Sequence, residues 1–177
     1  NRNSFSLGLA EARDYILARF MAADLLVSSH DFMLGNSSCS PAPPPVQIQN
    51  PIGIKRGYVQ PERWIVVGAH YDSRNSVRCD GSASPQPGAN DNASGCAGVI
   101  ELARAFEDVP TEKSIVFACF AGEEQGLVGA YAWVQRNAMP VWRGEGNFLD
   151  LLKKDRDVAA RLSDAELESL FDLGYHL

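Results

Sequence analysis

The chain has 177 residues, of which 16 are basic and 22 acidic, so its formal net charge is -6. Hydrophobic residues make up 45% and charged residues 21%, which is ordinary for a globular domain with its own core. Lys and Arg form no cluster, so neither a nucleic-acid partner nor an anionic membrane surface is expected. No apolar run approaches the ~20 residues that a membrane span needs.

The N-terminal third predicts a helix, a strand and a loop. Apolar residues recur at helical spacing over residues 8–24, which predicts an amphipathic helix. Residues 25–34 suit a strand, and residues 36–45, with four prolines, predict a loop. A short edge strand is expected at 46–48. His30 is interpreted as a strand residue without a special role.

Two apolar runs farther along predict a pair of buried strands. Residues 64–69 are rich in β-branched side chains and predict a central strand that is buried on both faces. A long loop over residues 71–90 follows, and loops of this length are usually functional. A helix from Ser94 to Glu107 leads to the second strand, at 114–121.

A turn at residues 122–126 and a helix from about Leu127 complete this part of the chain. The order strand, helix, strand, helix predicts an α/β fold, in which a mostly parallel sheet is flanked by helices. Strands 64–69 and 114–121 are expected to be adjacent and parallel. In such sheets, ligands bind at the carboxyl ends of the strands.

Polar residues stand where these two strands end: His70, Asp72, Asp91, Glu123 and Glu124. One imidazole and four carboxylates gathered at one edge of a sheet would repel one another, and a divalent cation removes that penalty. Imidazole nitrogen and carboxylate oxygen both suit zinc. The sequence therefore predicts a zinc site at this edge.

The spacing also indicates roles for these side chains. An Asp at the junction of a loop and a helix, such as Asp91, can bridge two metal ions. A ligand His usually donates its second ring N–H to a carboxylate, and Asp72 is placed to support His70 in this way. Of the adjacent Glu123 and Glu124, one can face the metal while the other acts as a base toward water.

Three ordered motifs resemble those of the two-zinc aminopeptidases, which include bacterial leucyl aminopeptidases and have glutamate carboxypeptidase and glutaminyl cyclase as relatives. The motifs are Gly68-Ala69-His70-Tyr71-Asp72-Ser73, Gly88-Ala89-Asn90-Asp91-Asn92-Ala93-Ser94-Gly95 and Gly122-Glu123-Glu124-Gln125-Gly126-Leu127. The resemblance covers residues 1–130. It implies that His70 binds one zinc ion, Asp91 bridges two and Glu124 binds the other. It further implies that Glu123 is the general base, that Asp72 supports His70, that the substrate is a peptide, and that the protein is secreted or periplasmic.

The sequence also departs from that family. The family completes its site with an Asp on a following strand and a late His, and neither has a counterpart after Gly129. Asp residues of the tail are interpreted as parts of solvated helix faces. One zinc ion or none, and impaired catalysis, are therefore expected. His70, Asp91 and Glu124 are still expected to converge on one point.

The tail, residues 131–177, resembles the C-terminal helices of bacterial adenylosuccinate lyases. Helices are expected at 127–137, 147–153 and 164–172, packing poorly on the sheet. The chain would then consist of an incomplete peptidase domain at 1–130 and a helical tail of different origin. A fragment or a misjoined reading frame explains such a junction better than a natural fusion. The alternative function is a non-catalytic fragment or chimeric chain, in which the tail acts as a helical scaffold or a lyase-like oligomerisation module.

The four cysteines fall into two groups. Cys39 and Cys79 lie in polar loops, where a disulfide and two unpaired thiols are both open alternatives. Cys96 and Cys119 lie in apolar segments and are predicted to be small buried residues. The chain starts at Asn1 without an initiator Met, so either a removed leader or a fragment is expected.

Overall fold

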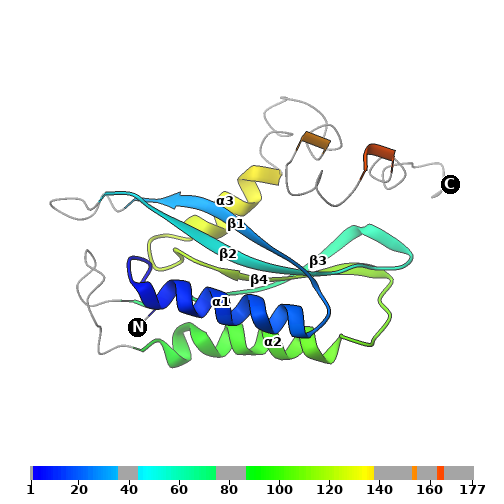
Figure 1. Ribbon diagram of the computed structural model, residues 1–177, viewed down its shortest axis with the longest axis horizontal. Coiled ribbons are helices and arrows are strands. Elements are labelled where there is room, and N and C mark those ends of the chain that lie inside the picture. Colours follow the sequence, from blue (N-terminus) through cyan, green and yellow to red (C-terminus); the bar gives the residue numbers. More distant parts are fainter. Residues whose placement is uncertain (1, 36–43, 75–86, 138–152, 155–162, 166–177) are drawn as a thin grey trace.

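The computed structural model describes residues 2–35, 44–74, 87–137, 153–154 and 163–165. Four strands form one sheet in the order β1-β2-β4-β3 (Figure 1). The strands are β1 (Leu26–Leu34), β2 (Val46–Lys55), β3 (Gln60–His70) and β4 (Lys113–Phe120). The predicted α/β class is confirmed. The described sheet is mixed, because β2 pairs antiparallel with both β1 and β4.

Strands β3 and β4 are adjacent and parallel, as the sequence predicted. In their register, Ile65 lies opposite Ile115 and His70 lies opposite Phe120. The connection between them includes α2 (Ser94–Ala105), which starts at the predicted residue. Parallel strands joined through a helix end at the same edge of the sheet, so His70 and the turn after Phe120 become neighbours.

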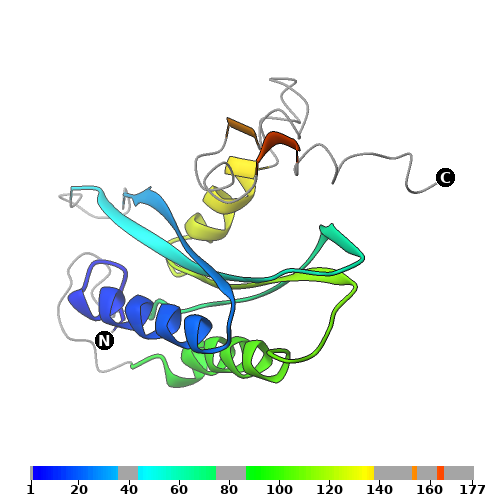
Figure 2. The ribbon, with the colours of Figure 1, turned by 45° about the vertical axis from the view of Figure 1, so that its right-hand side comes forward.

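Helices cover both faces of this sheet. Figure 2 shows α1 (Leu7–Ala22) and α2 on one face and α3 (Val128–Asn137) on the other. Along β4, Phe117 and Cys119 belong to the core beneath α1 and α2, whereas Val116 and Ala118 pack on the opposite side with Trp133 of α3. Strand β4 is therefore buried on both faces, as predicted for residues 114–121.

The prediction for the other apolar run is wrong. Strand β3 pairs with β4 alone within the described residues and lies at the edge of their sheet. Trp64, Ile65 and Val66 are 44%, 50% and 47% exposed. The run was expected to be central because β-branched apolar residues favour buried strands, but such a pattern does not encode how many neighbours a strand has.

Strand β2 also differs from the expectation of a short edge strand at 46–48. It is ten residues long and lies between β1 and β4. The polar pair Gln49-Asn50 and Pro51 interrupt the apolar pattern, yet all three residues are paired with β1. Asn50 is fully buried, so a polar residue here marks an internal contact and not the end of the strand.

The remaining local predictions are mostly confirmed. The first helix and strand are α1 and β1, and the predicted helix at 127–137 is α3. Cys96 and Cys119 are buried and form no disulfide. Cys39, Cys79 and almost all of the predicted helices at 147–153 and 164–172 lie outside the described residues.

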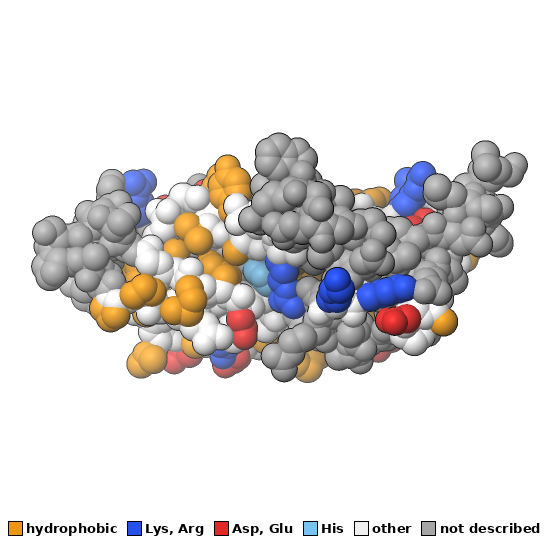
Figure 3. Space-filling model, turned by 90° about the horizontal axis from the view of Figure 1, so that it is seen from above, with side chains coloured by type: hydrophobic (Ala, Val, Ile, Leu, Met, Phe, Trp, Pro, Cys, Tyr) orange, Lys and Arg blue, Asp and Glu red, His pale blue; other side chains and the backbone are white. Residues whose placement is uncertain are grey.

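The outer surface combines apolar and basic areas. Seen from above, hydrophobic side chains gather on the left of the face, and a row of Lys and Arg side chains runs from near its centre to the right (Figure 3). The helices in the described part of the chain are all too short or too polar to cross a bilayer.

Candidate metal and catalytic site

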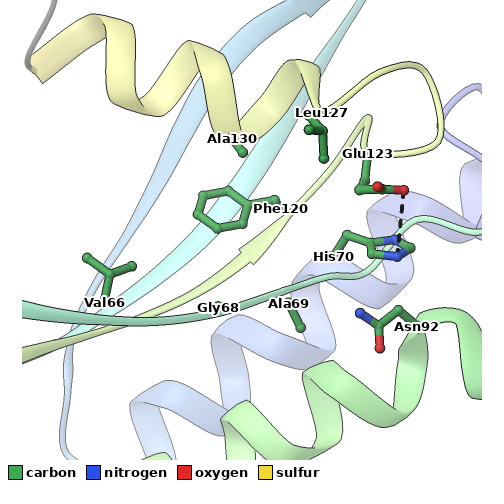
Figure 4. Close-up of a pocket in the computed structure, with 9 residues that line it drawn as sticks. All are labelled: Val66, Gly68, Ala69, His70, Asn92, Phe120, Glu123, Leu127 and Ala130. Atoms are coloured by element: carbon green, nitrogen blue, oxygen red, sulfur yellow. Dashed lines mark ion pairs between the residues drawn. The ribbon is translucent and has the colours of Figure 1, made fainter.

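His70, the last residue of β3, lies at the centre of the predicted residues. Its Nε2 atom is 3.0 Å from Asp91 Oδ1 and 3.7 Å from Glu123 Oε2, and its Nδ1 atom is 3.4 Å from Asp72 Oδ1. Figure 4 shows the carboxylate of Glu123 and the ring of His70 facing each other. Four of the five predicted residues are thus brought together at the edge where β3 and β4 end.

Asp72 holds this edge together from inside the protein. Its side chain is fully buried. Oδ1 accepts a hydrogen bond from the backbone N–H of Glu123 at 3.3 Å, and Oδ2 accepts one from the N–H of Glu124 at 3.2 Å. Oδ2 also accepts a bond from Ser4 Oγ at 3.1 Å. The sequence predicted that Asp72 supports His70, and the structure adds that it anchors the turn carrying both glutamates.

Asp91 lies in an irregular turn, Ala89–Ala93, immediately before α2. The turn starts after Gly88, whose φ of +64° falls in the left-handed region that favours glycine. The Arg2 side chain donates hydrogen bonds to three carbonyl oxygens, those of Tyr71, Pro87 and Gly88, at 2.7 to 2.8 Å. Arg2 therefore ties the segment that leads to Asp91 to the end of β3.

Sequence reasoning did not identify Arg2 or Ser4 as parts of the site. A few polar residues before an amphipathic helix are typical of any helix start. Ser4 is buried and lies 68 residues from its partner Asp72, and Arg2 lies 85 residues from Pro87. No local pattern signals contacts across such distances.

The charges around His70 shape its titration. Close contact with the Asp72 carboxylate, with further attraction from Glu123 and Asp91, raises the pKa of His70 to about 9 against the opposing effect of burial. Burial raises the pKa of Glu124, and the carboxylates of Asp91, Asp72 and Glu123 add to this effect. The shift of His70, and the smaller contribution of the neighbouring carboxylates to that of Glu124, indicate a negative potential, which favours a bound cation.

The donor types at this edge suit zinc, which binds imidazole and carboxylate groups. Glu124 Oε1 is buried and has no hydrogen-bond partner within the described residues, so its lone pairs are available to bind a metal ion. However, no three His, Cys, Asp or Glu side chains of the described segments are grouped so that they could hold one metal ion. The residues thus fit zinc by chemistry while lacking a closed arrangement.

Asp91 meets His70 directly, whereas the backbone N–H of Glu124 is held by Asp72. The assignment of His70, Asp91 and Glu124 as ligands that converge on one metal ion stays a prediction. The roles assigned to the five residues stay predictions.

An apolar cavity of about 400 Å³ opens beside His70 and Glu123. Its wall includes Val66 of β3, Phe120 at the end of β4, and Leu127 and Ala130 near the start of α3 (Figure 4). A cavity with apolar walls and a few convergent polar groups is the usual form of a small-molecule or side-chain binding site.

Two family models match the sequence. Peptidase family M28 matches residues 52–149, which is more than half of the chain. The C-terminus of adenylosuccinate lyase matches residues 128–177. Both resemblances seen in the sequence are thereby confirmed, and the two matched regions overlap at 128–149, on either side of the predicted junction.

Individual proteins named as zinc metalloproteases or aminopeptidases also match the sequence. A probable zinc metalloprotease of Pyrenophora teres is 40% identical over 129 residues, which cover 70% of this chain and 28% of the relative. Aminopeptidase YwaD of Bacillus subtilis is 37% identical over 117 residues, which cover 64% of this chain and 24% of the relative. The chain thus spans about a quarter of the length of these curated relatives.

Solved structures share the fold. A glutaminyl cyclase of Fimbriiglobus ruber superposes with a TM-score of 0.57 at 23% identity, over 70% of this chain and 40% of the cyclase. A Zn-dependent exopeptidase of Parabacteroides distasonis gives a TM-score of 0.56 at 20% identity, over 70% of this chain and 41% of the exopeptidase. At such identities the likeness concerns the fold alone.

Proposed function

Because the chain belongs to peptidase family M28, we propose that it is part of a zinc-dependent aminopeptidase that hydrolyses N-terminal peptide bonds. The observation that carries this proposal is the contact set of His70, which joins Asp72, Asp91 and Glu123 at the end of two parallel strands. The named activities of the relatives belong to proteins about four times as long as the matched segment. Catalysis by this chain is proposed to be impaired, because the Asp and the late His with which the resembled family completes its site have no counterpart after Gly129.

In the proposed mechanism, His70, Asp91 and Glu124 would hold zinc. A zinc ion supplies Lewis acidity for the scissile carbonyl and lowers the pKa of water. Glu123, which is 34% exposed and faces the cavity, takes a proton from the attacking water and delivers it to the leaving amine. Asp72 fixes the ring of His70 and the backbone of both glutamates. The apolar cavity would receive a substrate side chain.

A second candidate function is a non-catalytic fragment or chimeric chain with a helical scaffold tail. Two observations favour it. No closed group of three ligands exists in the described part of the chain. In addition, residues 128–177 match the C-terminus of a lyase, and the peptidase match ends at residue 149.

The zinc content of the purified full chain separates these two functions. If the chain is part of a zinc peptidase, elemental analysis after dialysis against zinc and then against buffer is expected to find one zinc ion per wild-type chain and none in the His70→Ala variant. A folded wild-type chain that retains no zinc at micromolar concentration would favour the non-catalytic function. Two tightly held zinc ions would instead show that residues of the tail complete the site.

We also propose export from the cytoplasm, a proposal supported only by the resemblance to secreted and periplasmic peptidases. The disulfide state of Cys39 and Cys79 in protein isolated from its natural source tests it. A Cys39–Cys79 disulfide, detected by mass spectrometry without reduction, is the expected result, since such bonds persist in oxidising compartments. Two free thiols in freshly isolated protein would count against export.

A further inference from the structure

Asn50 lies in the middle of β2, fully buried, and uses its whole amide group. Its Oδ1 atom accepts a hydrogen bond from the backbone N–H of Ala121 at 2.9 Å. Its Nδ2 atom donates to the carbonyl oxygen of Gly129 at 2.9 Å and lies 3.1 Å from Nδ1 of His30 on β1. Donation to that nitrogen requires the proton of a neutral His30 to be on Nε2. His30 is thus more than a strand residue without a role.

The two backbone groups that Asn50 holds are the two ends of one turn. Between Ala121 and Gly129 lie Glu123 and Glu124. The ends of the turn are also joined directly, because Val128 N–H donates to Gly122 O at 3.0 Å and Gly129 N–H donates to Ala121 O at 3.1 Å. These joined ends form the stem of the turn, and the side chain of Asn50 binds both of them from β2.

Gly129 permits the close approach that the stem needs. A Cβ atom at this position would lie 2.1 Å from Ala121 O and 2.6 Å from Asn50 Oδ1, far inside contact distance. The turn is therefore held at two levels. Asn50 holds its base, and Asp72 holds its tip through the N–H groups of Glu123 and Glu124.

We propose that Asn50, with His30 behind it, is a positioning residue that sets where the Glu123–Glu124 turn stands relative to His70. It touches neither substrate nor metal and acts through the stem of the turn. No other side chain of similar size replaces it: Asp lacks the two donors, and Leu lacks all three groups. The expected loss of zinc affinity in Asn50 variants rests on the proposed zinc function. The expected change in hydrogen exchange of the turn does not.

The experiment compares Asn50→Asp and Asn50→Ala with Ser114→Ala in the full chain. Ser114 is a matched control, because it is also buried in the sheet and makes two hydrogen bonds, to Pro61 O and from Gly57 N–H. It lies at the start of β4, at the other end of the strand from the turn. Amide hydrogen exchange and zinc titration calorimetry are the two readouts.

Both Asn50 variants are expected to speed exchange of the Glu123 and Glu124 amides at least ~10-fold relative to the Val116 amide, the local opening expected of a released turn. Zinc affinity is expected to fall ~10–100-fold, as for the loss of an outer-shell partner. Ser114→Ala should change neither the exchange ratio nor the zinc affinity. Asn50→Asp keeps the acceptor for Ala121 N–H, so it provides a folded variant if Asn50→Ala does not fold.

Uniform acceleration of exchange over the whole sheet, equal in the Asn50 and Ser114 variants, would overturn the proposal and leave Asn50 a purely structural residue. Failure of the zinc function is distinguishable from this result. If the wild type binds no zinc, the exchange ratio at Glu123 and Glu124 alone decides whether Asn50 positions the turn.

Discussion

Asp72 is a fully buried carboxylate whose described partners are hydrogen-bond donors or a basic ring. Ser4 and two backbone N–H groups donate to it, and His70 lies 3.4 Å away. A buried charge without such partners would cost several kcal/mol, on the order of the stability of a whole domain. The residue that is predicted to support His70 is thus also a structural anchor.

Changing Asp72 to Asn is expected to lower the free energy of unfolding by about 1–3 kcal/mol. The amide retains one acceptor oxygen, so its NH₂ group must face an N–H or O–H donor. Urea unfolding followed by circular dichroism measures the loss. Asp108→Asn, at an exposed position without a hydrogen bond to another described residue, is the control and should be neutral within ~0.5 kcal/mol. An Asp72 variant as stable as this control would contradict the anchoring role.

The two adjacent glutamates are expected to differ in their effect on zinc. Glu124→Gln should weaken zinc binding by more than the ~10–100-fold that losing an outer-shell partner costs, because an amide oxygen carries no charge. Glu123→Gln should leave zinc binding nearly unchanged and instead lower any leucyl anilide hydrolysis by ~10²–10⁴, the usual contribution of a general base. Calorimetry and the anilide assay measure the two effects. Equal zinc affinities in both variants would show that the glutamates are misassigned.

How far the sequence predicts single residues depends on distance along the chain. His70, Asp72, Glu123 and Asp91 were predictable because each lies at or shortly after the end of a strand or shortly before a helix, and parallel strands end together. Ser4, Arg2 and Asn50 were not, since the partners that connect them to the site lie 68 to 86 residues away and no periodicity records the contact. The direction of the Glu124 side chain was also not predictable, because spacing along the chain does not fix it.

At the level of elements, the burial of a strand was partly predictable from the sequence, but the strands beside which it lies were not. The apolar run of β4 predicted burial on both faces, and the structure agrees. The similar run of β3 lies at an edge, and the polar-looking β2 lies in the middle. Hydrophobic pattern reports the average environment of a strand, whereas strand order depends on contacts made by other parts of the chain.

Two glycines in different elements provide a paired prediction. Gly129→Ala is expected to destabilise the chain by at least ~1–3 kcal/mol, because its Cβ would collide with Ala121 O and Asn50 Oδ1. Gly98→Ala, in the middle of α2 with nothing within 4 Å of the added atom, is expected to stabilise the chain by ~0.5–1 kcal/mol.

Thermal unfolding of both glycine variants measures these effects. Opposite shifts of the melting temperature are the expected result. A stabilising effect of alanine at both positions would mean that the stem of the Glu123–Glu124 turn is looser than the structure shows.

For the whole molecule, the two family matches meet at α3. The M28 match continues to residue 149, and the lyase match begins at 128, so α3 falls in both. Trp133 of α3 packs on Phe120 of β4, with ring centroids 6.2 Å apart. The division into parts at 1–130 and 131–177 stays a prediction.

An exposed apolar edge strand favours pairing between copies of the chain. Ile65, half exposed on β3, is the position where a charge disturbs this edge with little effect on the core. Ile65→Lys is expected to reduce self-association in concentrated solution, as measured by light scattering, with an unfolding free energy within ~0.5 kcal/mol of the wild type. Ile115→Lys, buried on β4, is the opposite control and should unfold the chain. Unchanged scattering in a stable Ile65→Lys variant would argue that the β3 edge does not mediate association.

The long reach of the contacts around Asp72 has a consequence for the order of folding. The pairing of β1 with β2 joins neighbouring segments, but Ser4, Asp72 and Glu124 meet only after the chain from residue 4 to residue 124 has been made. On a ribosome that adds ~5–20 residues per second, the segment that contains Ser4 is therefore made several seconds before the turn to which Asp72 connects it. Contacts of high sequence separation also form slowly in refolding, so the edge that carries His70 and the two glutamates is expected to be the last part of the sheet to become native.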